Sequence, residues 1–574
     1  MIYETIFWLA YLSGIGSYIL RAEEYIRPFN YFSFIALATA ILAIHIQSQK
    51  DDRYKYWQLG KVILLCLTTQ WSLLLLYPDS ILGSDPWYHH MIVNKIISGE
   101  ITGVDYYGTL LFQLITGHGS QLFGISIKWA EMLFIGLPYI AGICWLVYRF
   151  GTMVRDHKTG LLAALSLSFA SMFLFFGIEI VPSSLGMLFA LAILHLLIRI
   201  CQVKSKWNIA RYAGISILFI ATMYLNALMI IFAILLMGLV WLGLQIYRSA
   251  TSSPTITTTP ILAYVVSCTA ITLIFWALNT GQINIMFRFV QSNFLLDPAL
   301  DGGQWPQALS MLTASSAETF EEMYAGIIAW QNTIPIHEVI LKKLGMYLYI
   351  GIGIIGCVVA QWPRFRNQYS VAFAIMGIIL VMTLTVNASL SRYLFLSRHA
   401  MLVQIMLAPV IGLLIASIPW KKSLVTGIAV FVLSLLTILS PYMNTDNRAI
   451  LPNVSTRLTL TQGEMSGIND LCQAWEGNIG SDWYAGYYIY HTKQGNKDWH
   501  VKKNLDISEA LFYKDFSKLS TDTLVIIRKE VVEYPVLVLD RAYRFGYDPT
   551  IELVQQGYGE IYNNGEIRGF LRQR

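Results

Sequence analysis

The chain has 574 residues, of which 55% are hydrophobic and only 13% are charged. Soluble domains carry about 25% charged residues, so this composition excludes an ordinary soluble protein and predicts a polytopic membrane protein. The net charge of +5 is spread over short loops and gives no basic face, which argues against a nucleic-acid partner. The six cysteines contain no CxxC pair and predict neither a disulfide framework nor a metal site of their own.

Apolar runs long enough to cross a bilayer as helices, about 20 residues each, recur along the first three quarters of the chain. The first run starts at once, with no basic segment or cleavage site before it, so we expect a retained span rather than a signal peptide. The runs predict an α-helical membrane protein with about thirteen spans, at 3–20, 31–47, 59–77, 129–148, 160–178, 184–201, 211–225, 227–247, 260–278, 344–361, 369–387, 399–418 and 422–441.

Lysine and arginine alternate between the loops as the positive-inside rule requires. With a cytoplasmic N-terminus, the cytoplasmic loops hold basic residues such as Arg53, Arg155 and Lys204, whereas the short outside loop at 178–184 holds none. We therefore expect a multi-pass protein of the cell membrane whose N-terminus is cytoplasmic.

This orientation gives a transmembrane domain over 1–442, with two long outside loops at about 78–128 and 279–343. The first loop is expected to contain two interfacial helices. Residues 443–574 follow as a small extracytoplasmic α/β domain. Its pattern predicts one helix and then four strands, at 463–475, 478–490, 523–528, 534–540 and 560–571.

A polar stretch in the first outside loop, Ile81-Leu-Gly-Ser-Asp-Pro-Trp-Tyr-His-His90, separates two apolar segments. Asp85 is a natural helix N-cap, and Pro86 suits the first turn because its missing N–H needs no partner there. Asp85 and His89 are four residues apart and share a helix face, whereas His90 points elsewhere. A carboxylate beside two imidazoles predicts a site; the alternative is that Asp85 only caps its helix.

Other charged residues lie at the outer ends of spans, where charge is costly unless it has a function. Glu179 lies between two spans, and Arg392 and Arg398 lie just before the span at 399–418. The two arginines violate the positive-inside rule, and an anionic headgroup such as a lipid phosphate would compensate them. The alternatives are that Glu179 pairs with an arginine at a helix end and that the arginines bind ordinary lipid headgroups.

Together these residues suit the transfer of a group from a lipid-linked phosphate to an acceptor hydroxyl. A carboxylate, Asp85, would deprotonate the acceptor as general base, and an arginine or histidine would neutralise the departing phosphate. Asp105, in a turn of the same loop, is a weaker candidate. A divalent metal such as Mg²⁺ or Mn²⁺ held by Asp85, His89 and Glu179 stays open, although no spacing motif demands it.

These motifs resemble the GT-C class of membrane glycosyltransferases, which use polyprenyl-phosphate-linked sugars outside the membrane. The resemblance rests on Ser84-Asp85-Pro-Trp-Tyr-His-His90 and on Glu179 before Val181-Pro-Ser-Ser-Leu-Gly186. It covers about 80–200 well and the rest by layout. The acid of the first loop is the catalytic base or a metal ligand in the class, which implies the same role for Asp85.

Two branches of the class remain as alternatives. Oligosaccharyltransferase catalytic subunits carry a Trp-Trp-Asp-Tyr-Gly signature and a Ser/Thr-x-x-Glu motif. The chain has similar but imperfect stretches at Ser481-Asp482-Trp-Tyr-Ala-Gly486 and Ser315-Ser-Ala-Glu318. Single-sugar transferases of the protein-mannosyltransferase and aminoarabinose-transferase type place their second large loop after the seventh span, counted from the span before the Asp loop. Here the spans from 59–77 to 260–278 number seven, and the loop at 279–343 follows them. The aromatic residues after Asp482 have a simpler interpretation, as a strand that packs on the membrane domain.

The sequence therefore predicts an inverting glycosyltransferase with a polyprenyl-phosphate-linked donor and a glycan, lipid or protein acceptor. An oligosaccharyltransferase that acts on protein asparagine is the first alternative. A transporter or flippase for lipid-linked saccharides is the second, but such proteins show inverted repeats and paired broken spans, and neither is evident in the sequence. A non-catalytic scaffold is the third.

Overall fold

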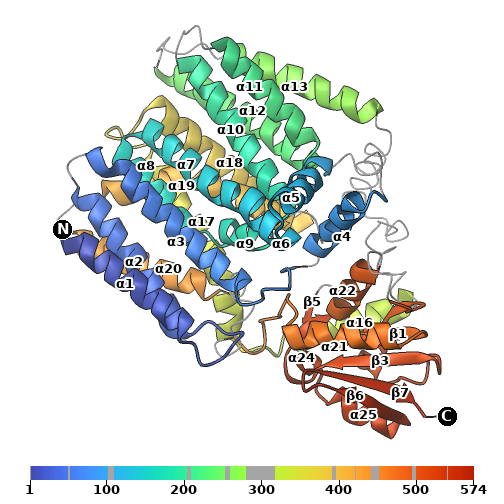
Figure 1. Ribbon diagram of the computed structural model, residues 1–574. Helices are drawn as coiled ribbons and strands as arrows, with labels where there is room; N and C mark the ends of the chain where they lie inside the picture. The colour runs from blue at the N-terminus through green and yellow to red at the C-terminus, as the bar shows by residue number, and fades with distance from the viewer. Residues whose placement is uncertain are drawn as a thin grey trace.

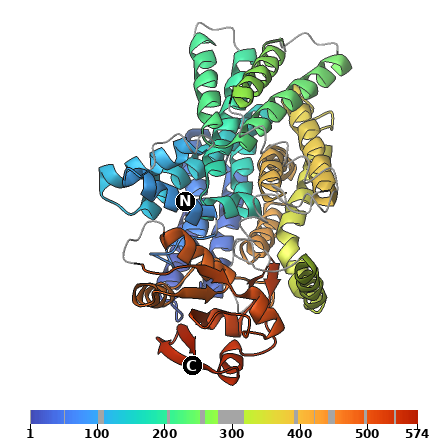
Figure 2. The same ribbon diagram turned by 90° about the vertical axis from the view of Figure 1, so that its right-hand side faces the viewer.

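The computed structural model describes residues 2–49, 52–83, 85–100, 109–202, 208–251, 259–278, 317–390, 396–419, 422–440, 451–493, 499–538 and 541–573. A bundle of helices forms one unit, and a smaller sheet-containing unit lies against one end of it (Figure 1). The side view shows the C-terminal unit, in orange and red, below the helical bundle (Figure 2).

The helical unit follows the apolar runs of the sequence closely. Its helices are α1 (Ile2–Ile19), α2 (Phe29–Ser48), α3 (Lys55–Leu74), α4 (Asp85–Ile97), α5 (Leu110–Phe123), α6 (Ile127–Glu131), α7 (Leu137–Val154), α8 (His157–Ser166), α9 (Ser171–Ile178), α10 (Pro182–Gln202), α11 (Asn208–Met223), α12 (Ala227–Thr251), α13 (Thr259–Leu278), α17 (Ile336–Val359), α18 (Gln368–Leu390), α19 (Leu396–Ser417) and α20 (Ser423–Ile438).

The prediction of about thirteen spans is not confirmed. Among the described residues, seven helices are long and apolar enough to cross a membrane, or eight if one bent pair counts as a span. Helices also cover the other predicted runs, but the apolar parts of α11, α13 and α20 are shorter than 18 residues, and α1 and α3 are less apolar because they carry charged side chains. Glu4 of α1 and Lys61 of α3 pair with each other at 2.6 Å. The two helices expected in the first outside loop are present as α4 and α5.

The run at 160–178 forms two helices rather than one span. The chain leaves the helical conformation at Ala170, where φ is −95° and ψ is 97°, and α9 is bent by 65° from the helix before it. Gln404 of α19 stabilises the break, because its Oε1 accepts a 2.8 Å hydrogen bond from the Met172 N–H and its Nε2 donates to Ser171 Oγ at 3.1 Å. Irregular backbone at membrane depth needs such protein partners in place of water.

Small residues allow the central helices to approach closely. A Cβ atom added to Gly412 of α19 would lie 2.5 Å from the carbonyl oxygen of Thr159 and 2.6 Å from the backbone nitrogen of Ala163, both in α8. Close backbone contact at glycine is how helices in membranes gain packing energy without a hydrophobic driving force. The bent α9 follows α8 along the chain, so this α8–α19 contact lies next to α9.

The C-terminal unit contains a five-stranded mixed sheet in the order β2-β1-β3-β7-β6, and a separate β4–β5 hairpin. Strands β1 and β2 are parallel, as are β1 and β3, whereas β7 is antiparallel to both β3 and β6. The elements are α16 (Ala317–Gln331), α21 (Gln462–Ala474), β1 (Asn478–Ser481), α22 (Trp483–Lys493), β2 (Asn504–Asp506), α23 (Ser508–Tyr513), β3 (Thr523–Arg528), α24 (Lys529–Glu533), β4 (Val536–Val538), β5 (Arg541–Tyr543), α25 (Pro549–Gln555), β6 (Tyr558–Asn563) and β7 (Ile567–Arg572).

Alternate residues of β3 fill two cores on opposite faces of the sheet, as the period of a strand requires. Leu524 and Ile526 pack with α21 and α22 in one core, and Val525 and Ile527 pack with α16 in the other. Helix α16 comes from the segment predicted as the second long loop, so this segment contributes to the C-terminal unit. The predicted strand at 478–490 is wrong beyond residue 481, because Asp482 starts the helix α22 there.

The close contact at Gly412 gives a first prediction. Replacing Gly412 with Ala should push α19 away from the α8 backbone and destabilise the protein by about 1–3 kcal/mol, seen as a lower melting temperature in detergent. Gly351→Ala is the matched control, because a Cβ added at Gly351 in α17 meets nothing within 4 Å. Equal melting temperatures for the two variants would contradict the close α8–α19 packing.

Candidate active site

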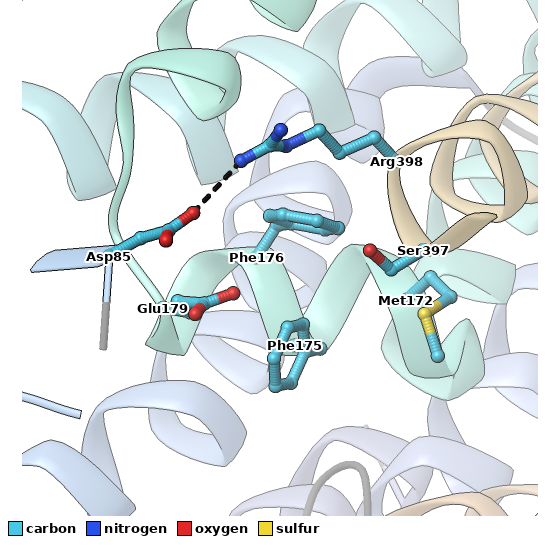
Figure 3. Close-up of a pocket in the computed structure, with 7 residues that line it drawn as sticks. All are labelled: Asp85, Met172, Phe175, Phe176, Glu179, Ser397 and Arg398. Carbon is cyan, nitrogen blue, oxygen red and sulfur yellow. Dashed lines mark hydrogen bonds and ion pairs between the residues drawn. The ribbon is translucent and has the colours of Figure 1, made fainter. Parts of the chain in front are cut away.

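Three segments far apart in the chain meet at one cavity of about 260 Å³ (Figure 3). Asp85 is the first residue of α4, Glu179 directly follows α9, and Arg398 is in the first turn of α19. The remaining lining side chains are Met172, Phe175, Phe176 and Ser397. A small cluster of charges therefore faces an apolar wall, which is the arrangement that an amphiphilic ligand needs.

An ion pair joins two of the charged groups. The Arg398 Nη2 donates a hydrogen bond to Asp85 Oδ2 at 3.1 Å. The side chains of Arg398 and Asp85 are 19% and 32% exposed, so a ligand in the cavity can reach both. The Asp85 carboxylate thus compensates the charge of Arg398, one of the two arginines predicted at this end of the span.

Glu179 is the second carboxylate of the cavity. Burial and the negative charge of Asp85, opposed by the positive charge of Arg398, together raise the pKa of Glu179 to about 8. At neutral pH this carboxyl group is therefore mostly protonated and can donate a hydrogen bond. Gly83 makes room for it: φ is +93° there, and an added Cβ would lie 2.6 Å from Glu179 Oε1.

The two histidines do not line the cavity. His89 is buried, with its Nδ1 3.2 Å from Gln113 Nε2, and the ring of His90 lies 5.8 Å from the ring of Trp87. Burial lowers the pKa of each imidazole to about 4, so both are neutral at pH 7. Neither is placed as a donor- or acceptor-binding cation in this structure.

Asp85, His89 and Glu179 also do not come together as metal ligands. Within the described part of the chain, no group of three or more His, Cys, Asp or Glu side chains is arranged to hold a metal ion. The chemistry of the cavity fits a cation supplied by Arg398 better than a three-ligand metal centre. A requirement for Mg²⁺ or Mn²⁺ stays a prediction.

The remaining candidates lie elsewhere. Arg392 and Asp105 fall outside the described residues. Glu318 is in the first turn of α16, whose inward face packs on the C-terminal unit. Asp482 is only 2% exposed and accepts hydrogen bonds from Arg528 Nε at 2.8 Å and Nη2 at 2.7 Å, so it is occupied by a structural partner.

Sequence reasoning did not find the apolar wall. Met172, Phe175 and Phe176 sit within two turns of Glu179, and they are indistinguishable in sequence from side chains that face lipid. Helical spacing from Glu179 is the one signal that could have identified Phe175 and Phe176.

The pKa of Glu179 gives a second prediction. The folded protein keeps this proton between about pH 4.5 and 8, whereas the unfolded chain releases it, so stability falls as pH rises through that window. In Glu179→Gln, the decline in melting temperature from pH 5 to pH 8 should be smaller by on the order of 2 °C. Thermal unfolding at several pH values measures this, and parallel curves would show that Glu179 is ionised in the folded protein.

Comparison with solved structures found proteins similar to this chain. No family model matches it, and no curated protein matches it. It is similar to the crystal structure of the Archaeoglobus fulgidus oligosaccharyltransferase in the apo form, with 12% identity and a TM-score of 0.48 over 91% of this chain and 75% of that chain. It is also similar to ArnT from Cupriavidus metallidurans bound to undecaprenyl phosphate, with 10% identity and a TM-score of 0.37 over 90% of this chain and 97% of that one.

Proposed function

We propose that the chain is an inverting membrane glycosyltransferase that moves a sugar from a polyprenyl-phosphate-linked donor to an acceptor on the outer face of the membrane. One observation carries the proposal: Asp85, Glu179 and Arg398, from three distant segments, converge on a cavity with an apolar wall. A charged phosphate and a prenyl chain are the two halves of one amphiphile, and the cavity offers a surface to each.

In this reaction the Asp85 carboxylate removes the proton from the acceptor hydroxyl as general base. The acceptor oxygen attacks the anomeric carbon, the bond from that carbon to the phosphate oxygen breaks, and polyprenyl phosphate leaves with the electron pair. A single displacement of this kind inverts the anomeric configuration.

Arg398 and Glu179 would stabilise the departing phosphate. The guanidinium of Arg398 neutralises the negative charge that develops on the leaving oxygen. Protonated Glu179 donates a hydrogen bond to another phosphate oxygen, which an ionised carboxylate cannot do. Because Arg398 pairs with Asp85, a donor phosphate would compete for the guanidinium and free the carboxylate to act as base.

Basic residues support the proposed orientation. Lys158 and Arg155 lie at the end of the bundle opposite the cavity. Lys158 donates to Gln47 O at 3.1 Å, and the guanidinium of Arg155 lies 5.1 Å from the ring centre of Phe365. Gln47 in turn donates to Ile415 O at 2.8 Å, near the end of α19 that is far from Arg398. The positive-inside rule assigns such an end to the cytoplasm. The cavity and the C-terminal unit then face outward.

The alternatives differ in what they need from the C-terminal unit and from the cavity. Asp482 is committed to Arg528, which speaks against direct contact with an acceptor peptide and favours single-sugar transfer over an oligosaccharyltransferase-like reaction. A flippase would move the donor without breaking its glycosidic bond, so release of free polyprenyl phosphate separates the two.

Replacing the proposed base is the most direct test. Asp85→Asn should lower kcat by about 100-fold or more, measured as release of undecaprenyl phosphate from a panel of undecaprenyl-phosphate-linked hexoses with a membrane extract as acceptor. Binding of undecaprenyl phosphate should persist, because Arg398 remains. Asp79→Asn is the matched control, an exposed carboxylate six residues earlier and outside the cavity. Transfer by Asp85→Asn at the wild-type rate would refute the proposal.

Orientation has its own test. Cysteine introduced at Lys518, a largely exposed residue of the C-terminal unit, should react with a membrane-impermeant maleimide in intact cells. Cysteine introduced at Arg364, exposed at the basic end, should react only after the membrane is opened. The native cysteines give little background, since five are buried and only Cys201 is partly exposed. The reverse pattern would place the cavity in the cytoplasm.

A further inference from the structure

The C-terminal unit holds the residues on both sides of Asp85. On the N-terminal side, the Gly83 N–H donates to Leu458 O at 2.9 Å, and the Leu460 N–H donates to Ser80 Oγ at 2.9 Å. On the C-terminal side, the Trp87 ring lies 4.9 Å from that of Tyr488, edge to face. Ile81 and Trp87 are 5% exposed and belong to the same hydrophobic core as α21 and α22. The start of α4 is thus part of the fold of the C-terminal unit.

One hydroxyl group lies at the centre of these contacts. Tyr484, near the start of α22 and 2% exposed, accepts a hydrogen bond from Trp87 Nε1 at 3.3 Å. Its oxygen is 2.6 Å from Leu458 O and 3.2 Å from Ile81 O, and its single proton serves these two carbonyls. Leu458 O is also the acceptor of the Gly83 N–H, so the hydroxyl links the chain before Asp85 to the chain after it.

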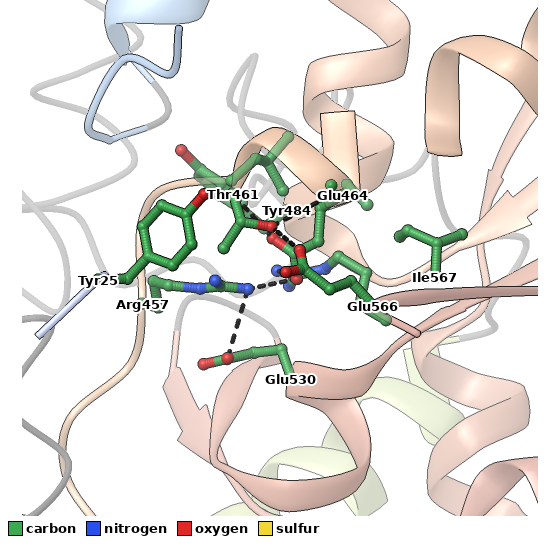
Figure 4. A network of polar contacts seen from close by, with 12 residues as sticks. Tyr25, Arg457, Thr461, Glu464, Tyr484, Glu530, Glu566 and Ile567 are labelled. Atoms are coloured by element: carbon green, nitrogen blue, oxygen red, sulfur yellow. Dashed lines mark hydrogen bonds and ion pairs between the residues drawn. The ribbon is translucent and has the colours of Figure 1, made fainter. Parts of the chain in front are cut away.

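Tyr484 is itself held by buried charges. The backbone N–H of Tyr484 donates to Asp482 Oδ1 at 3.2 Å, and Arg528 of β3 holds both oxygens of that carboxylate. Arg528 also reaches Glu464 at 3.5 Å. Glu464 in turn pairs with Arg457 (Figure 4). Buried charges that are paired in this way are costly to separate. The Tyr484 hydroxyl therefore has a fixed place relative to the sheet.

We infer that Tyr484 is a positioning residue for the Asp85 carboxylate, acting through Trp87 and Ile81 without touching the substrate. The inference rests on the proposed function, in which Asp85 must meet the acceptor oxygen at hydrogen-bond distance. A displacement of about 1 Å at a catalytic group can cost about 100-fold in rate. The C-terminal unit then tunes catalysis from outside the cavity, and Asp482 contributes by holding Tyr484 in place.

The test compares two tyrosines of the same helix. Tyr484→Phe removes the central hydroxyl and should lower kcat by about 10-fold or more while leaving KM for the donor and the binding of undecaprenyl phosphate unchanged. Tyr488→Phe is the control: it is 3% exposed and packs on Trp87, but its hydroxyl donates to Asn469 within the C-terminal unit at 3.2 Å. Its kcat should stay within about twofold of wild type. Thermal unfolding checks that both variants lose similar stability.

Two further readouts separate positioning from a general loss of structure. Amide hydrogen exchange at Gly83 and in the first turn of α4 should speed up in Tyr484→Phe and not in Tyr488→Phe. Combining Tyr484→Phe with Asp85→Asn should add no loss beyond Asp85→Asn alone, because the tyrosine acts through that carboxylate.

The outcomes distinguish the two ideas. If wild-type protein releases undecaprenyl phosphate, Asp85→Asn does not, and Tyr484→Phe behaves like Tyr488→Phe in both kcat and exchange, the positioning role is overturned and the proposed function stands. If Asp85→Asn transfers normally, the proposed function fails, and faster exchange at Gly83 in Tyr484→Phe then reports only a structural contact. A fall in kcat confined to Tyr484→Phe supports the inference.

Discussion

The cavity depends on the meeting of Arg398 and Asp85 at the end of a helical bundle. Either charge alone would be unfavourable beside the apolar side chains of Phe175 and Phe176, because apolar contacts do not offset the free energy of desolvating an unpaired charge. The 3.1 Å ion pair stabilises both charges, so Arg398 of α19 and Asp85 at the start of α4 can lie side by side next to α9. The protonation of Glu179 follows from the same constraint, since a third charge would leave the cavity with a net negative charge in an environment of low polarity.

The C-terminal unit completes this arrangement from the other side. Its sheet is anchored by Arg528, which is 1% exposed and bound by two acids, and the core on one face of the sheet incorporates Ile81 and Trp87. The membrane unit supplies the cation and the protonated acid, whereas the C-terminal unit fixes the acid that starts α4. In the proposed reaction, the group that binds the donor phosphate and the group that activates the acceptor thus belong to different parts of the fold.

Much of the site could be predicted from the sequence, because charges at the outer ends of spans are conspicuous. Asp85, Glu179 and Arg398 were identified in that way and lie together in the structure, whereas His89 was assigned from helical spacing alone and faces Gln113. The break at Ala170 could not be predicted, because no Gly or Pro marks it and its partner Gln404 lies more than two hundred residues away. The aromatic run after Asp482 predicts a strand, because Trp and Tyr favour strands, but it forms the helix α22. The Asp482 carboxylate accepts hydrogen bonds from the Tyr484 and Ala485 N–H groups and so caps the start of that helix.

The break at Ala170, just before α9, has a mechanical consequence. Gln404 of α19 is hydrogen-bonded to the first residues of α9, so Glu179 and Arg398 belong to two helices that are joined directly. Asp85 is held instead by the C-terminal unit, whose core includes Ile81 and Trp87. Any relative movement of the two parts would therefore lengthen the Arg398–Asp85 ion pair and leave the spacing of Glu179 and Arg398 unchanged.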